Sequence, residues 1–157
     1  MPRKSYPLEA LLNLRNRRVK DAAVELASTV REREGAAERR QALEAVRARA
    51  AAEAARAREA ERETLEKGEL RVADLQRGQA WEKVVQGEQR ALDEKVEQAA
   101  IAEQGAADDE ARVRGQLSER KADADVVDRD RSRYLERARK RIVAVEEESA
   151  SEAWRKR

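Results

Sequence analysis

Apolar residues recur every seven positions along the C-terminal half of the chain, from Leu75 to about Glu148, and no proline interrupts this stretch. A seven-residue apolar repeat stays on one face only when two helices wrap around each other, so the pattern predicts one long helix in a coiled coil. At about 1.5 Å per residue, this helix is on the order of 110 Å long. The first series of positions is Val85, Leu92, Ala99, Ala106, Val113, Arg120, Val127 and Tyr134, and the second, more mixed series is Val96, Glu103, Glu110, Leu117, Ala124, Arg131, Ala138 and Val145.

The N-terminal half carries a similar stripe and predicts a first helix over about residues 6–65. Near Gly35 the apolar positions shift by about three residues, and a shift of that size predicts a local overwinding of the coiled coil. The stripe begins with Leu8, Leu12, Val19 and Leu26, with Ala23, Val30 and Ala37 beside it, and resumes as Leu43, Val46, Ala50, Ala54 and Ala57.

A short connection over residues 66–73 separates the two stripes. Gly68 is suited to end the first helix, and Asp74 is suited to cap the start of a second helix over about 74–150. If the turn centres near residue 69, facing residues have numbers that sum to about 138, which places Leu12 opposite Val126 and brings large residues against large or small ones along most of the length. We therefore predict an all-α fold in which residues 1–157 form a single antiparallel coiled-coil hairpin.

The hairpin has two expected weak regions. Val30 to Ala37 faces Ile101 to Asp108, where large apolar side chains are scarce, so this zone is expected to open most easily. The second helix also extends beyond the first, and residues after about Tyr134 lack a partner within the chain. These residues include Leu135, Ile142, Val143, Val145 and Trp154.

The composition of the chain excludes several classes of function but does not identify one. Charged residues make up 43% of the chain and aromatic residues only 3%, with a mean hydropathy of −0.97, which is typical of long helices and leaves disorder as the structural alternative. The chain contains no His and no Cys, so it lacks the usual zinc ligands, the commonest general base and every Ser–His or Cys–His nucleophile. We expect no enzymatic activity, no cofactor and no metal site. No apolar run is long enough to span a membrane and no secretory signal is evident, so a cytoplasmic protein is expected.

Basic charge is concentrated in two segments that the hairpin would bring to its open end. Residues 1–20 carry six basic and one acidic side chain, a net charge of +5, and residues 129–141 carry seven basic and two acidic ones, also +5; because the whole chain has +2, the remainder sums to −8. Three interpretations fit: a docking surface for acidic loops of a protein partner, a nucleic-acid site, or a solvated helix face. The scarcity of aromatic residues disfavours nucleic acid.

Two further features have a structural and a functional interpretation. An apolar cluster near the turn, which includes Leu75, Trp81 and Val85, either packs inside the hairpin or exposes an anchor for a partner. The carboxylate runs 108–110 and 146–148 could in principle bind a cation, but consecutive helical residues point in different directions and make a poor cage.

The two ends of the sequence resemble a known family. The segment YPLEALLNLRNRRVKDAAVELA, from Tyr6 to Ala27, looks like the start of the FliJ/YscO family, the central-stalk proteins of bacterial type III secretion systems. The segment SERKADADVVDRDRSRYLERARKRIVAVEEESASEAW, from Ser118 to Trp154, resembles the C-terminal helix of the YscO branch. This resemblance implies a two-helix antiparallel coiled coil similar to the rotor stalk of rotary ATP synthases.

The resemblance also implies partners and contact residues. In the family the open end enters the pore of a hexameric secretion ATPase and promotes its assembly and ATP turnover, another part of the stalk contacts the cytoplasmic domain of the export-gate membrane protein, and secretion chaperones are bound and recycled. An aromatic and an aliphatic residue four positions apart touch the gate, a spacing that Trp81 and Val85 match. The ATPase-ring contacts carried over to this chain are Arg15, Arg17, Arg18, Lys20, Arg137, Arg139, Lys140 and Arg141.

Two other functions remain open from the sequence. A generic coiled-coil scaffold or adaptor without an ATPase partner would form a parallel homodimer whose helices continue through Gly68. A peripheral-stalk subunit of a rotary ATPase is the third hypothesis. Mass and length in solution separate the hairpin from the parallel dimer, which approaches twice the hairpin's length.

Overall fold

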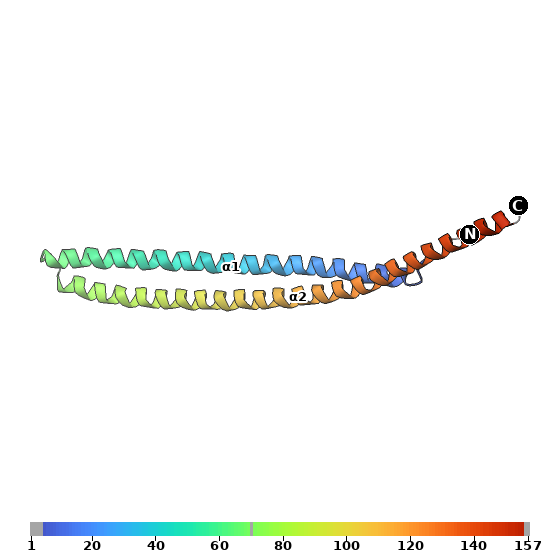
Figure 1. Cartoon of the computed structure of the whole chain (residues 1–157). Coiled ribbons are helices and arrows are strands. Elements are labelled where there is room, and N and C mark those ends of the chain that lie inside the picture. The colour runs from blue at the N-terminus through green and yellow to red at the C-terminus, as the bar shows by residue number, and fades with distance from the viewer. Residues whose placement is uncertain (1–4, 70, 156–157) are drawn as a thin grey trace. The chain divides into compact units, whose positions relative to one another are not determined.

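The computed structural model describes residues 5–69 and 71–155, which form two long helices joined by a short turn (Figure 1). Helix α1 spans Glu9–Glu66 and helix α2 spans Val72–Arg155, with no strand among the described residues. The predicted all-α fold with two long helices in a hairpin is confirmed. Helix α2 begins slightly before and ends slightly after the predicted range. None of the described helices contains a stretch long and apolar enough to cross a membrane.

Gly68 ends α1 as the sequence predicts. Its φ of 72° lies in the left-handed region, which costs glycine little because it has no Cβ. The Gly68 N–H donates to the carbonyl of Leu65 at 2.9 Å and the Glu69 N–H donates to the carbonyl of Thr64 at 3.3 Å. These two bonds form a Schellman motif, which satisfies carbonyls that the end of α1 would otherwise leave without partners.

The predicted role of Asp74 as the N-cap of the second helix is wrong by three residues. Helix α2 begins at Val72, and the Asp74 carboxylate accepts a hydrogen bond from the backbone N–H of Arg71 at 3.0 Å. Asp74 therefore lies inside the first turn and reaches back to the residue before the helix, as the acidic residue of a capping box does. A carboxylate there also suits the positive end of the helix dipole.

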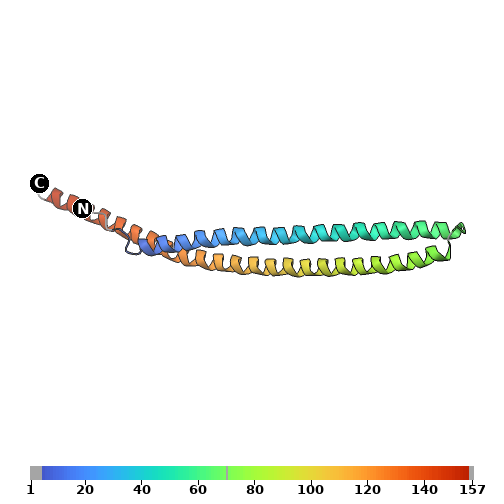
Figure 2. The ribbon, with the colours of Figure 1, turned by 180° about the vertical axis from the view of Figure 1, so that it is seen from behind.

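Contacts divide the chain into two compact units, one made of residues 1–28 and 111–157 and the other of residues 29–110. In the second unit the two helices run antiparallel from the turn, side by side in both views (Figures 1 and 2). Four ion pairs join them across the seam: Arg33–Glu110 at 2.8 Å, Arg40–Glu103 at 2.6 Å, Arg47–Asp93 at 3.2 Å and Arg58–Glu82 at 2.7 Å.

The unit formed by the two terminal segments contains the principal cluster of buried apolar side chains. Leu12 and Val127 are 4% and 5% exposed and pack with Tyr6, while Leu11 and Tyr134 cover the cluster. The sequence placed Val126 opposite Leu12, and this is wrong because Val126 is 64% exposed. Helical periodicity explains the difference, since Val127 continues the seven-residue series and its neighbour points away from the seam.

The two predicted series on the second helix are confirmed by burial. Every member of the series from Val85 to Tyr134 is buried or half-buried, and so is every member of the second series from Val96 to Ala138. Only the last predicted position, Val145, is exposed, at 64%. The regular spacing of buried positions is what packing in a coiled coil requires.

The predicted phase shift near Gly35 does not occur. On α1 the buried or half-buried positions Ala22, Thr29, Ala36, Leu43 and Ala50 follow one another by sevens without a break. The apolar residues shift in the sequence only because arginines occupy the companion series at 33, 40 and 47, where their guanidinium groups form the ion pairs to α2. The helix therefore keeps one heptad register, and at positions 33, 40 and 47 the seam contains arginines in place of apolar residues.

Candidate protein-docking site

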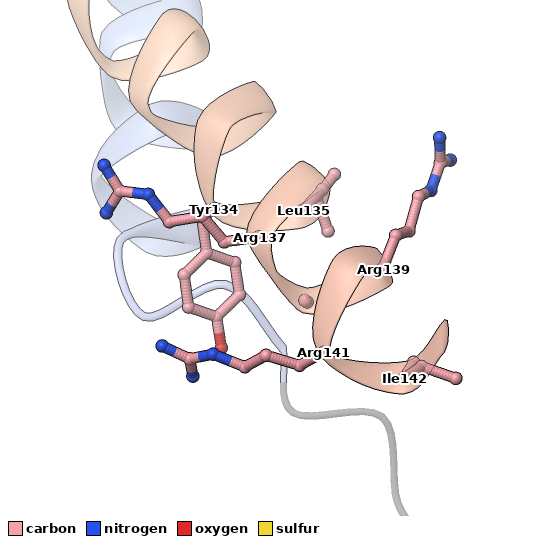
Figure 3. Close-up of a pocket in the computed structure, with 7 residues that line it drawn as sticks. Tyr134, Leu135, Arg137, Arg139, Arg141 and Ile142 are labelled. Atoms are coloured by element: carbon pink, nitrogen blue, oxygen red, sulfur yellow. The ribbon is translucent and has the colours of Figure 1, made fainter. Parts of the chain in front are cut away.

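The C-terminal part of α2 carries an open groove just beyond the buried cluster. Figure 3 shows Tyr134, Arg137 and Arg141 on one side of the helix and Leu135, Arg139 and Ile142 on the other. With Ala138 these residues line the groove. Seven-residue helical spacing explains the arrangement, because Tyr134 and Arg141 share one edge while Leu135 and Ile142 share the other.

Two tyrosines close the hairpin at the near end of this groove. The Tyr6 hydroxyl donates a hydrogen bond to the Asp130 carboxylate at 2.7 Å, and the rings of Tyr6 and Tyr134 lie 5.5 Å apart between centroids, tilted by 59°. The hydrogen bond to Asp130 and the burial of the ring raise the pKa of Tyr6 to about 12. An ion pair of 3.0 Å between Arg131 and Glu9 fixes the first turn of α1 beside this contact.

Beyond the tyrosine pair, α2 is exposed. Ala138 is half-buried, and residues 139–155 are all exposed. The large apolar side chains here have exposed fractions of 40% for Leu135, 56% for Ile142, 64% for Val145 and 83% for Trp154. The predicted exposure of the apolar residues beyond Tyr134 is confirmed. Clustered apolar side chains with a charged border are typical of sites for protein partners.

The predicted ATPase-ring residues fall into two groups, one near the start of α1 and one in the C-terminal part of α2. The Arg15 guanidinium donates to the backbone carbonyl of Asp123 and is half-buried, while Arg17, Arg18 and Lys20 are exposed. Arg137 lies fourteen residues beyond Asp123, on the order of 20 Å along the helix. The two basic segments are neighbours at the open end, as the contacts of Tyr6 with Asp130 and of Glu9 with Arg131 show, but Arg15 lies opposite Asp123, well before the groove.

The three arginines that line the groove are better placed to bind a partner's carboxylates than Lys140, which already has an acidic partner. Lys140 forms an ion pair of 2.9 Å with Glu136 one turn earlier, and its hydrogen bond and charge hold the pKa of that carboxyl below the usual range. Arg137, Arg139 and Arg141 are exposed on the borders of the groove. The positive charge that faces a ligand there comes chiefly from these three side chains.

The predicted export-gate residues lie at the seam of the unit formed by residues 29–110. Val85 is buried, at 9% exposed, and Trp81 is half-buried. Their four-residue spacing is also the spacing of a helix face that packs on a partner helix. A contact of Trp81 and Val85 with an export gate stays a prediction, and of the two only Trp81 offers appreciable surface.

Two carboxylates of the run 108–110 have partners within the hairpin, and the run 146–148 is exposed. Asp108 accepts a hydrogen bond from the Gln104 side chain at 2.9 Å, and the Glu110 side chain is 7% exposed and paired with Arg33. The residues described by the structure contain no group of three or more metal-ligating side chains arranged to hold an ion.

The charged seam of the hairpin was not predicted from the sequence. Glu103, Glu110 and Arg131 interrupt the second apolar series, and each of them meets an oppositely charged residue of α1. The signal was available, because Arg33, Arg40 and Arg47 are themselves spaced by sevens. An apolar count alone cannot detect a seam position that a charged residue fills.

Comparisons with protein-family models, with curated proteins and with solved structures found no match to this chain. The resemblance to the FliJ/YscO family therefore stays a prediction from the sequence.

Proposed function

We propose that this chain is a non-enzymatic central stalk of a type III secretion apparatus, in which the groove segment of α2 docks in a hexameric secretion ATPase. The observation that carries the proposal is a hairpin whose second helix extends past the first with Arg137, Arg139 and Arg141 exposed beside apolar side chains. A protruding helix with this composition can enter the ring and contact acidic loops there. The resemblance of both chain ends to the FliJ/YscO family supplies the identity of the ring.

In this docking, the exposed arginines would attract the acidic surface of the ATPase, and the apolar side chains of the groove would make the specific contacts. Exposed arginines accelerate association with an acidic surface and form bidentate contacts with carboxylates, while Leu135 and Ile142 lose their contact with water. The stalk promotes ring assembly and ATP turnover by stabilising one arrangement of subunits around an asymmetric helix. It performs no chemistry itself and acts in the cytoplasm, peripheral to the membrane through its partners.

The first prediction concerns stimulation of the ATPase. Reversing Arg137, Arg139, Lys140 and Arg141 to Glu should lower stimulation of the secretion ATPase from the same organism by at least tenfold, because like charges then oppose docking. The measurement is phosphate release by the ATPase with increasing amounts of the stalk. Circular dichroism should show unchanged helicity, since these side chains are exposed.

A matched control reverses four exposed arginines elsewhere on α1, namely Arg31, Arg39, Arg49 and Arg56. This control makes the same change in net charge and should preserve stimulation within about twofold. The variant of Arg17, Arg18 and Lys20 to Glu tests the other predicted group separately. Unchanged stimulation by the variant with Arg137, Arg139, Lys140 and Arg141 reversed to Glu would count against the docking role.

A second prediction concerns the export gate, whose cytoplasmic domain we propose as the partner of the turn-proximal part of the hairpin. Trp81→Ala should weaken binding to this domain at least fivefold while lowering the melting temperature by only a few degrees, because the ring is half-buried and keeps exposed area. Calorimetric titration and thermal unfolding give the two values. The opposite ranking would assign Trp81 to the hairpin seam alone.

The rival function is a coiled-coil scaffold without an ATPase partner. Its parallel form requires both helices to continue through Gly68, whereas the left-handed glycine and the Schellman motif end α1 there. A scaffold built from the hairpin remains a rival, and an affinity experiment against the purified ATPase, the gate domain and secretion chaperones separates it from the stalk. Binding to none of the three would favour the scaffold.

A further inference from the structure

The exposed end of α2 continues the face that packs against α1. Ala124, Val127 and Tyr134 are buried or half-buried against α1, and the same helical face continues through Ala138, Ile142 and Val145. Tyr6 packs on Tyr134 and Glu9 pairs with Arg131, so α1 starts at this level. From residue 135 onward the described part of the chain offers this face no second helix.

Charge along this segment changes sign at its middle. The four residues Arg137, Arg139, Lys140 and Arg141 come first, and Glu146, Glu147, Glu148 and Glu152 follow. The apolar residues Ile142, Val143 and Val145 lie between the two groups and are 50–64% exposed. Because the basic residues come first and the acidic residues follow, two copies of this segment that run in opposite directions bring the basic residues of one copy against the acidic residues of the other.

We propose that the segment 135–152 pairs antiparallel with the same segment of a second copy of this chain, about a two-fold axis between Val143 and Ala144. The contact is isologous, so each pair of facing residues occurs twice. Ile142 of each copy faces Val145 of the other, and Ala138 faces Ser149. The segment 135–152 of the second copy thus packs on α2 of the first copy beyond residue 134, where α1 no longer covers it.

The charged borders fit this register. The seam of this dimer lies one residue further along the helix than that of the hairpin, because Leu135 and Ile142, rather than Tyr134 and Arg141, take heptad position a. Arg139 and Glu146 then both occupy position e, and Arg141 and Glu148 both occupy position g. Antiparallel coiled coils bring e opposite e and g opposite g, so each arginine meets a glutamate of the other copy. Two-fold symmetry gives four such ion pairs around the apolar centre.

Steric exclusion selects the antiparallel orientation. In a parallel dimer the second α2 would continue back along the seam face that α1 already covers up to Tyr134. In the antiparallel pair the body of the second copy lies beyond residue 152, away from the first α1. The seam spans about five helical turns, which belongs to the class of weak, reversible interfaces.

This pairing does not rest on the proposed function, although it uses some of the same residues. A dimer would cover Arg139 and Arg141, so self-association and docking to an acidic partner exclude each other. The experiment therefore uses the purified full chain alone.

Sedimentation equilibrium tests the pairing directly. The wild type should change from 17.8 kDa toward twice that mass as its concentration rises to about 1 mM. Arg139→Glu with Arg141→Glu makes both borders acidic, and Glu146→Arg with Glu148→Arg makes both basic, so each double variant should dimerise at least tenfold more weakly. An equimolar mixture of the two double variants should restore association, because every facing pair is then of opposite charge. Arg17→Glu with Arg18→Glu is the matched control and should dimerise like the wild type.

Cysteine cross-linking tests the orientation, since the natural chain has no Cys. Mixed Ala138→Cys and Ser149→Cys chains should form a disulfide between the two variants under mild oxidation. Disulfides only between identical variants would show a parallel pair and overturn the proposal. A wild type that stays monomeric throughout, or double variants that fail to associate when mixed, would overturn it as well, and unchanged helicity of each variant excludes misfolding as the cause.

Discussion

At the scale of single residues, Tyr6 couples the first residues of the hairpin to α2. Its hydroxyl donates to the carboxylate of Asp130 and its ring packs on Tyr134, in a cluster completed by Leu12 and Val127. A phenolate could not donate this hydrogen bond and would be repelled by the carboxylate. The neutral form is therefore the one that the folded state favours, which is why the pKa of Tyr6 rises from 10.0 to about 12.

The raised pKa predicts a pH dependence of stability. The contribution of Tyr6 is fully present below about pH 10 and is lost as the pH rises to about 12, because the unfolded chain releases the phenolic proton first. The melting temperature of the wild type should therefore fall across this window. Tyr6→Phe keeps the ring but removes the hydroxyl, so it should melt a few degrees lower at pH 8 and show a shallower fall above pH 10.

Tyr134→Phe is the control for this titration, because no hydrogen bond of its hydroxyl is needed for the ring contact. Absorbance of tyrosinate gives the two titrations separately in the two variants. An ordinary pKa near 10 for the phenol that remains in Tyr134→Phe would contradict the role of Asp130.

At the scale of the helices, charged seam residues set which part of α1 meets which part of α2. Arg33, Arg40 and Arg47 are spaced by one heptad, and each pairs with a carboxylate across the seam. Their side chains are 36–47% exposed, so each pair is worth roughly 0.5–1 kcal/mol. Their larger effect is on specificity, because a shifted or parallel alignment would separate the opposite charges.

Reversal of this ladder gives the element-scale prediction. Changing Arg33, Arg40 and Arg47 together to Glu should lower the free energy of unfolding by about 2–4 kcal/mol, since attraction is replaced by repulsion. Urea unfolding followed by circular dichroism measures the change. Adding the reciprocal changes of the partner carboxylates to Arg should recover more than half of the loss. Equal losses in the triple variant and in the sixfold variant would show that the charges contribute nothing to pairing. The sixfold variant carries Arg33→Glu, Arg40→Glu, Arg47→Glu, Asp93→Arg, Glu103→Arg and Glu110→Arg.

The helices also show how far the sequence could predict the fold. Heptad counting on the second helix identified the buried positions from Val85 to Tyr134, because apolar residues dominate that series. It failed on α1 around Gly35, where arginines fill seam positions and the apolar residues suggested a shift. The predicted register of the two helices was close, because Arg15 contacts Asp123 and these two numbers sum to 138. Heptad counting did not predict the polar contacts of Tyr6, Glu9 and Arg131, which hold the start of α1 against α2.

At the scale of the whole molecule, burial is distributed unevenly along the two helices. Val113 is 1% exposed and Leu117 9%, in the same unit as the cluster around Val127. In the other unit Ile101 is 67% exposed, and the seam near it consists of small or charged side chains. Local opening costs less free energy where fewer apolar contacts must be broken.

Hydrogen exchange followed by mass spectrometry should therefore resolve three levels of protection in the dilute protein. Amides of residues 113–127 should exchange slowest, those of residues 101–108 at least tenfold faster, and those of residues 139–155 fastest, because this last segment has no helix packed on it within the described chain.

Raising the concentration should slow exchange in residues 135–152 alone if these segments of two copies pair, and adding the secretion ATPase should slow the same segment if it docks in the ring. The Glu146→Arg, Glu148→Arg variant separates the two causes, because it removes the partner of each tail arginine in the dimer but keeps the arginines themselves. Protection by the ATPase that survives in this variant, together with loss of the concentration effect, would assign the segment both roles.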